Sequence, residues 1–175
     1  MNKRGLFIGC TLVASTFTPL AHAVDGISLE VGRSSESSDT YRLAAQFDFG
    51  TTLWQSQSRN VRLGGYWDAG VVRWSGLDTT SFGVSPVLRL EFGQVGAMTP
   101  YVELGVGAAY FTRSSINNGD PDLGSRFHFE DRLGSGVRFS GGSELGVRVF
   151  HYSNAGLKEP NQGIENASLF YRMPI

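Results

Sequence analysis

Cysteine is almost absent from this chain, which has one cysteine, Cys10, among 175 residues. Cys10 lies in an N-terminal segment that we expect to be removed, so the exported protein has no thiol. This absence excludes disulfide scaffolds, thiolate metal sites and cysteine nucleophiles. Lipidation at Cys10 is disfavoured, because the apolar stretch continues past it to a better cleavage site.

The N-terminal segment has the features of a secretory signal peptide. Lys3 and Arg4 precede an apolar run over residues 6–20, and Ala21-His22-Ala23 has the small-x-small pattern of a cleavage site. We therefore expect a signal peptide at residues 1–23 and a single outer-membrane β-barrel domain at residues 24–175.

An excess of basic charge is also missing. The chain has 15 basic and 16 acidic residues, and two of the basic ones lie in the leader, which leaves a net charge near −3. A nucleic acid is therefore not an expected partner, because no basic surplus is present to neutralise phosphates. No later segment has about 18 consecutive apolar residues, the length needed for a transmembrane helix. A secreted globule and an outer-membrane barrel remain.

Helical stripes are hard to find, and an alternation of period two runs through the chain instead. Turn residues separate the alternating segments at Ser140–Ser143, Asn117–Pro121 and Lys158–Gly163. The pattern predicts eight strands, at residues 27–31, 41–49, 61–71, 81–92, 101–110, 126–139, 144–150 and 167–175.

One face of these strands is apolar and the other is charged. A soluble barrel such as a lipocalin turns its apolar face inward, whereas a membrane barrel turns it outward. Charges of both signs share the other face: Arg42, Asp48, Arg62, Asp68, Arg89, Glu91, Glu103, Glu130, Arg132, Arg138, Glu144, Arg148 and Arg172. An eight-stranded barrel is only wide enough for packed side chains. We therefore predict an all-β, eight-stranded antiparallel transmembrane β-barrel with an apolar exterior and an ion-paired, plugged interior.

Aromatic residues support the same orientation. Trp67, Phe92, Phe111 and Tyr171 are available for belts at the membrane interfaces. A secreted sandwich with an unusually charged face is the alternative.

Three polar residues interrupt the apolar face together. Alternation from residues 145, 147 and 149 reaches His151 and Ser153, and counting back from Ile175 along the last strand reaches Glu165 on the same face. A polar group that faces lipid is costly and is a functional candidate by default. These residue types also fit a Ser-His-acid triad, with a nucleophile, a base and an orienting carboxylate. Polar residues at a strand end that simply meet water or headgroups are the competing interpretation.

Acyl transfer also needs hydrogen-bond donors for an oxyanion. The nearby candidates are Asn154, Asn161 and the backbone amides near Gly156 and Gly163. Asn and Gly are also ordinary turn residues, and for Gly163 in particular we favour a role in the turn. Lys158 is expected to be a solvated loop residue.

Two further residues stand out more weakly. His128 is expected to be structural on the charged inner face, and Asp131 breaks the apolar pattern of its strand without an assigned role. No His/Asp/Glu cluster has a metal-ligand spacing, so we expect neither metal nor cofactor.

Residues 151–175, HYSNAGLKEPNQGIENASLFYRMPI, resemble the C-terminal end of the outer-membrane lipid A 3-O-deacylases, the PagL family. YWDAG at 66–70 and FEDRLGSG at 129–136 are similar to the same family. The resemblance implies a serine esterase with His151 as base, Ser153 as nucleophile and Glu165 as the orienting acid. It also implies oxyanion stabilisation by Asn161, and Asn154 and Gly156 match other motif positions.

The resemblance further implies hydrolysis of the acyl ester at the 3-position of lipid A in lipopolysaccharide, at the outer leaflet of a bacterial outer membrane. It implies outer-membrane lipids as partners and allows a homodimer. Two alternatives stay open: a non-catalytic structural or adhesive barrel, and another lipid acyl hydrolase or transferase.

Overall fold

The structure is a computed structural model that describes residues 24–114 and 123–175. The expected leader, with Cys10, and the expected turn Asn117–Pro121 lie outside the described residues. Within the described part, no helix is long and apolar enough to cross a membrane.

The described residues form nine antiparallel strands in one sheet. They are β1 (Gly26–Ser34), β2 (Asp39–Asp48), β3 (Trp54–Gln55), β4 (Val61–Trp74), β5 (Thr79–Phe92), β6 (Met98–Phe111), β7 (Phe127–Phe139), β8 (Glu144–Ser153) and β9 (Ile164–Pro174).

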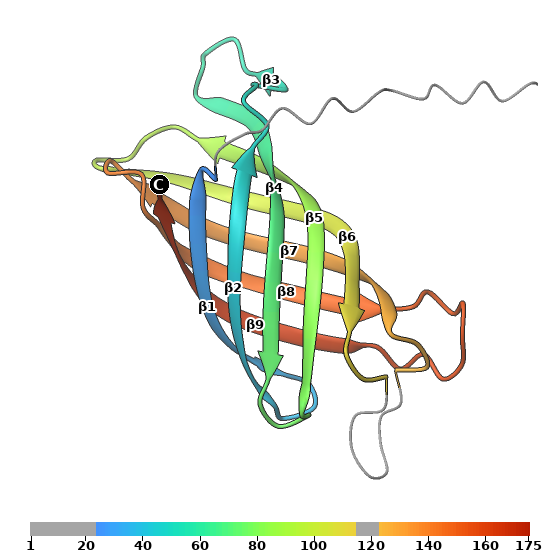
Figure 1. Cartoon of the computed structure of the whole chain (residues 1–175). Coiled ribbons are helices and arrows are strands. Elements are labelled where there is room, and N and C mark those ends of the chain that lie inside the picture. The colour runs from blue at the N-terminus through green and yellow to red at the C-terminus, as the bar shows by residue number, and fades with distance from the viewer. Residues whose placement is uncertain (1–23, 115–122) are drawn as a thin grey trace, which may run out of the picture.

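The sheet closes on itself through eight of these strands. β1 pairs with β9, and β2 pairs with β4, so the eight long strands form a closed cylinder (Figure 1). This confirms the predicted eight-stranded antiparallel barrel. The two-residue strand β3 pairs with β4 at Leu63 and Arg62. Sequence alternation did not predict it, because two residues are too few to show a period.

The connections fall at two ends of the cylinder. The end at which β1 begins and β9 ends, here the terminal rim, also has the connections after β2, β5 and β7 (Figure 1). The opposite rim has the connections after β1, β4, β6 and β8. The predicted turns at Ser140–Ser143 and Lys158–Gly163 are confirmed as the connections that follow β7 and β8.

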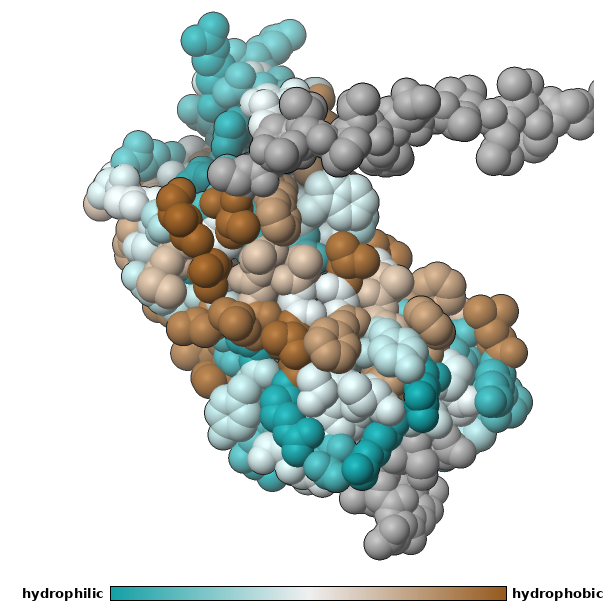
Figure 2. All heavy atoms as spheres, in the orientation of Figure 1, coloured by the Kyte–Doolittle hydropathy of each residue, from teal (hydrophilic) through white to brown (hydrophobic). Residues whose placement is uncertain are grey.

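The outer surface of the cylinder is apolar. Every second residue of a strand exposes a large hydrophobic side chain, as with Val31 (54% exposed), Leu104 (55%) and Leu133 (62%). Figure 2 shows the resulting hydrophobic band, with hydrophilic residues gathered at both rims. An apolar band between two polar rims is the surface that a bilayer requires of a barrel.

The interior is filled with paired charges. Arg148 is fully buried and donates hydrogen bonds to Glu30 Oε1 (2.6 Å), Glu103 Oε1 (2.6 Å) and the Tyr66 hydroxyl (3.2 Å). Arg132 reaches Asp68 at 2.8 Å. Burial of a charge is tolerated only where partners satisfy it, so the predicted ion-paired plug is confirmed. Glu30 belongs to this network, although the sequence pattern had not singled it out.

A second interior layer lies nearer the opposite rim and is apolar. It consists of Val72, Trp74, Leu77, Ala109, Phe111, Leu123, Phe150, Tyr152 and Ile164. The belt prediction for Phe111 is therefore wrong: this side chain is fully buried. Its neighbour Tyr110 faces outward with the even-numbered residues of β6, so alternation turns Phe111 inward.

Two charges expected inside lie at the terminal rim instead. The side chains of Asp48 and Arg62 are 54% and 46% exposed. Both are on the inner face of their strands, but they sit where the cylinder opens to solvent, and Arg62 pairs there with Glu91 at 2.8 Å.

Replacement of Arg148 by leucine should lower the free energy of unfolding by about 3–5 kcal/mol, because Glu30 and Glu103 then lose a buried cationic partner. Urea unfolding in lipid vesicles, followed by tryptophan fluorescence, measures this change. The control is Arg62→Leu, which breaks a half-exposed pair and should cost at most about 1 kcal/mol. Equal effects of both variants would show that the interior network does not hold the barrel together.

Candidate active site

Two outward-facing side chains end strand β8 at the opposite rim. Phe150 and Tyr152 are fully buried, and Tyr152 packs against Trp74 and Phe111 with ring centroids at 5.6 and 5.5 Å. Since successive residues of a strand point to opposite faces, these inner contacts force His151 and Ser153 onto the outer wall. The predicted outward parity of both residues is confirmed.

The neighbouring strand supplies a carboxylate to the histidine. His151 and Glu165 are direct partners in the β8–β9 register. His151 Nδ1 lies 3.0 Å from Glu165 Oε1, and the two side chains are 43% and 54% exposed. Because a carboxylate can only accept, Nδ1–H donates the hydrogen bond to Glu165. The other ring nitrogen, Nε2, is then available to accept a hydrogen bond from a hydroxyl.

Backbone contacts also fix Glu165. Its N–H donates to Ser35 Oγ at 3.2 Å, and its carbonyl accepts from the Ser35 N–H at 3.0 Å. The first turn at this rim therefore holds the start of β9 in register beside His151.

Ser153 lies on the same wall, about 6.6 Å farther along β8 than His151. Its side chain is partly exposed, and within the described ranges Ser153 Oγ has no hydrogen bond to another side chain or backbone group. The structure thus joins the expected base and acid and leaves the serine hydroxyl free on the same face.

Gly163 forms the back of the imidazole site. It is buried, it has a φ of +71°, and a Cβ at this position would lie 3.0 Å from His151 Cε1 and 3.1 Å from the Tyr152 carbonyl oxygen. Contacts this short are tighter than most Cβ atoms make, so the histidine ring or the loop would have to shift to admit a side chain. Gly163 therefore does more than complete a turn, because its missing side chain is the space that the histidine ring occupies.

The loop between β8 and β9 is held by Asn154, which is 2% exposed. Its Nδ2 donates to the carbonyl oxygens of Leu123 (3.2 Å) and Lys158 (2.7 Å), so both amide hydrogens are used. The Asn154 N–H donates to Asn161 Oδ1 at 2.9 Å. The side chain of Asn154 thus organises the loop. The Asn161 carboxamide is held through its oxygen, and its NH₂ group is available to donate a hydrogen bond to a substrate.

The remaining loop candidates face solvent. Gly156 is exposed with a φ of +74°, and no atom lies within 4 Å of where its Cβ would be. Lys158 is exposed as well.

Strand β7 brings a second acid close to the histidine. Asp131 is exposed on the outer wall and is the direct partner of His151 in the β7–β8 register, while Phe129 is the partner of Ser153. Sequence reasoning noticed Asp131 but could not place it, because its position opposite His151 depends on the register between the strands. His128, by contrast, is 4% exposed and its Nε2 lies 2.8 Å from the Ser125 carbonyl oxygen inside the barrel.

The site has the groups of nucleophilic acyl transfer: a hydroxyl, an imidazole with one nitrogen free, and a carboxylate that orients the ring. Among the residues that the structure describes, no group of three or more His, Cys, Asp or Glu side chains could hold a metal ion.

Comparisons with known proteins agree on one family. Residues 39–174 match the family model for lipid A 3-O-deacylase (PagL). The chain is 43% identical over 167 residues to a lipid A deacylase PagL from Pseudomonas aeruginosa, with 93% of each chain covered. It is 41% identical over 71 residues to a lipid A deacylase PagL from Bordetella bronchiseptica, covering 41% of this chain and 39% of that one.

A solved structure is similar as well. The crystal structure of the outer membrane enzyme PagL superposes with a TM-score of 0.79 at 45% identity, and it covers 86% of this chain and 99% of its own.

Gly163→Ala should slow the reaction of Ser153 with a fluorophosphonate probe at least about tenfold, because the new Cβ displaces the imidazole that activates the hydroxyl. The labelling rate of the folded protein in detergent measures this. Gly96→Ala is the matched control: Gly96 has a φ of +61°, and a Cβ there meets nothing within 4 Å. Equal labelling of both variants would mean that Gly163 does not set the position of His151.

Proposed function

The chain belongs to the lipid A 3-O-deacylase (PagL) family, and we propose that Ser153, His151 and Glu165 carry out its reaction on the lipid-facing wall of the barrel. The protein is an outer-membrane enzyme that hydrolyses an ester of lipid A in lipopolysaccharide. The observation that supports the assignment of the site is the 3.0 Å contact between His151 and Glu165 on the outer wall of the barrel.

The membrane itself delivers the substrate in this proposal. The terminal rim faces the periplasm, as in bacterial barrels whose chains begin and end on that side, so the triad lies at the outer leaflet. Lipid acyl chains then lie directly against β8 and β9. The hydrolysed ester needs no passage through the interior, which ion-paired side chains fill.

The first chemical step forms a bond between Ser153 Oγ and the carbonyl carbon of the ester. A rotation of the serine side chain brings the hydroxyl to His151 Nε2, which removes its proton as the bond forms. The Glu165 carboxylate accepts a hydrogen bond from His151 Nδ1–H, so it holds the ring in place and stabilises the imidazolium.

The tetrahedral intermediate then expels the sugar oxygen. His151 donates its proton to that oxygen as the carbon–oxygen bond breaks, and the acyl group remains on Ser153. Water, deprotonated by His151, attacks the acyl-enzyme in the same manner. The products are a free fatty acid and a lipid A hydroxyl group, and the triad returns to its starting protonation state.

Asn161 is the side chain best placed to donate to the oxyanion. Its oxygen accepts the Asn154 N–H at 2.9 Å, which fixes the plane of the carboxamide and directs the NH₂ group away from that contact. Preorganised donors of this kind stabilise charge without a reorganisation cost at the moment of reaction. Asn154 contributes by holding Asn161 and the loop, and the backbone N–H of Gly156 is a further donor in the same loop.

The proposal also covers the organisation of the chain. Residues 1–23 act as a removable leader, and residues 24–175 form the single barrel domain. All three reacting groups come from two adjacent strands of one barrel, so the mechanism does not require a homodimer.

Ser153→Ala should abolish deacylation, a loss of at least about 1000-fold, because it removes the hydroxyl that lies two residues from His151 on the same strand face. Mass spectrometry of lipid A after incubation of lipopolysaccharide with the purified protein measures the loss of the acyl chain. Heat-modifiable migration in SDS gels controls for folding. Glu165→Ala should cost less, since the displaced histidine still acts as a base. Full activity of the serine variant would remove Ser153 from the mechanism.

Asn161→Ala should lower kcat about 100- to 1000-fold with little change in KM, the result expected when an oxyanion donor is lost. The same mass-spectrometric assay, run as a time course at several substrate concentrations, separates the two constants. An increase in KM alone would assign Asn161 to ground-state binding instead of the transition state.

A further inference from the structure

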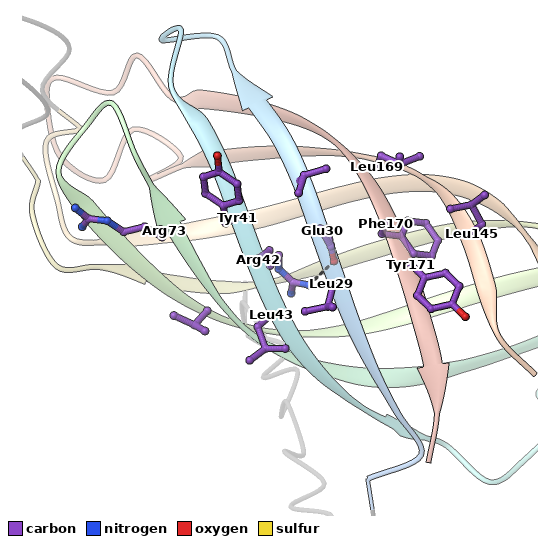
Figure 3. Close-up of a pocket in the computed structure, with 12 residues that line it drawn as sticks. Leu29, Glu30, Tyr41, Arg42, Leu43, Arg73, Leu145, Leu169, Phe170 and Tyr171 are labelled. Carbon is purple, nitrogen blue, oxygen red and sulfur yellow. Dashed lines mark hydrogen bonds and ion pairs between the residues drawn. The ribbon is translucent and has the colours of Figure 1, made fainter.

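An apolar groove lies on the outer wall close to the candidate triad. Its volume is about 550 Å³, and it extends over β1, β2, β4, β8 and β9. The apolar side chains that line it include Leu29, Tyr41, Leu43, Leu145, Leu169 and Tyr171 (Figure 3). Val31 lines it as well. Beneath this lining, the buried ion pair between Arg42 Nη1 and Glu30 Oε1, at 2.7 Å, closes the wall toward the interior.

The groove and the triad share strand β9. On the outer face of this strand, Glu165 is followed by Ala167 and then by Leu169, which lines the groove. Ala167 is the smallest of these side chains. The groove therefore lies on the same outer face of β9 as Glu165, with Leu169 four residues farther along the strand.

Cationic groups lie at the opposite-rim end of the groove. Arg73, the penultimate residue of β4, lines it, and Arg33 is the outward residue that follows Val31 on β1. Their side chains are 50% and 67% exposed. Arg33 is also the direct partner of Ala167, which is two residues from Glu165 on β9.

These two arginines have acidic neighbours, but the positive charges in this cluster outnumber the negative ones. Arg33 pairs with Asp39 at 3.2 Å, and Asp78 is shared between Arg73 (2.9 Å) and Arg113 (2.8 Å). The hydrogen bond from Arg73 lowers the pKa of the Asp78 carboxyl, so Asp78 stays ionised. Three guanidinium groups thus face two carboxylates, and each guanidinium keeps further N–H donors for a phosphate.

The other flank of the triad has the opposite character. There Asp131 is the direct partner of His151, and the next outward position across the sheet is the apolar Val106. A phosphate is repelled by the carboxylate on this side and attracted by the guanidinium groups on the β1–β4 side. The charges on the wall therefore favour one direction for an anionic headgroup that is bound at Ser153.

The dimensions are compatible with a single glycolipid. Adjacent strands are about 4.8 Å apart, so β4 lies three spacings, or about 14 Å, from β9. Lipid A is a phosphorylated disaccharide with several acyl chains. Its headgroup can extend along the rim over this interval while its chains run down the wall.

We propose that the groove and its two arginines form the docking site of the reacting lipid A molecule. The groove binds an acyl chain that is not cleaved, and Arg33 and Arg73 bind the phosphate of the headgroup. This inference rests on the proposed function, because it assumes that the scissile ester lies at Ser153.

Kinetics with matched substrates test the phosphate contact. Arg73→Ala should raise KM for phosphorylated lipid A in detergent micelles about tenfold and leave kcat within twofold, since a charge-assisted hydrogen bond is lost in binding. The same variant should leave KM for dephosphorylated lipid A unchanged. Arg73→Lys should recover part of the affinity, and Arg33→Ala should act like Arg73→Ala. The control is Arg126→Ala, which lies at the same rim beyond the other flank of the triad. This variant should leave KM unchanged for both substrates.

A second pair of variants tests the groove. Val31→Trp fills it, whereas Val106→Trp places the same side chain on the other flank at a valine of similar exposure, 54% against 56%. Val31→Trp should raise KM for lipid A at least fivefold, and Val106→Trp should not. A short-chain p-nitrophenyl ester has no second chain, so Val31→Trp should raise KM for this ester by a smaller factor than KM for lipid A.

The outcomes separate the two proposals. A wild-type protein that releases no acyl chain from lipid A overturns the proposed function. A wild-type protein that does so, together with Arg73→Ala and Val31→Trp variants that match their controls, overturns the docking site alone. An equal KM increase of Arg73→Ala for phosphorylated and dephosphorylated lipid A overturns the phosphate contact. Inhibition by phosphatidylglycerol vesicles as strong as by product lipid A would assign the groove to anionic phospholipid instead.

Discussion

The interior ion network is the constraint on which the remaining structure depends. Arg148, Arg132 and their buried carboxylates lie inside the barrel as paired charges, because the burial of an unpaired charge is costly. Their position decides which face of every strand points inward. Strand alternation then assigns the opposite face, with its exposed leucines and valines, to the membrane.

The site follows from this constraint at the rim of the barrel. Near the end of β8, the inward residues change from charged to aromatic, and buried Phe150 and Tyr152 keep the alternation rigid up to Ser153. His151 is thereby held on the lipid side, where Glu165 of the next strand meets it. In the proposed mechanism the reacting groups lie on the outer wall, so the ester reaches them from the bilayer and not through the barrel interior.

The outer wall has opposite charges on the two sides of the proposed triad. Asp131 stands on one side of His151, and Arg33 stands diagonally across Glu165 on the other. The loop above the site is tied down by Asn154 and leaves space for the imidazole at Gly163. In our proposals, catalysis and substrate orientation thus depend on residues of neighbouring strands on one side of the barrel.

The sequence by itself determined the eight long strands, the inward charged face and the outward position of His151, Ser153 and Glu165. These features depend on period-two alternation, which is a local property of the chain. Only the tertiary structure decided the features that depend on register and loop closure. The pairing of His151 with Asp131 as well as Glu165, the entry of Glu30 into the buried network and the inward role of Phe111 are of this kind. So is the space at Gly163, because neither strand offset nor the approach of a loop to a side chain leaves a periodic signal in the sequence.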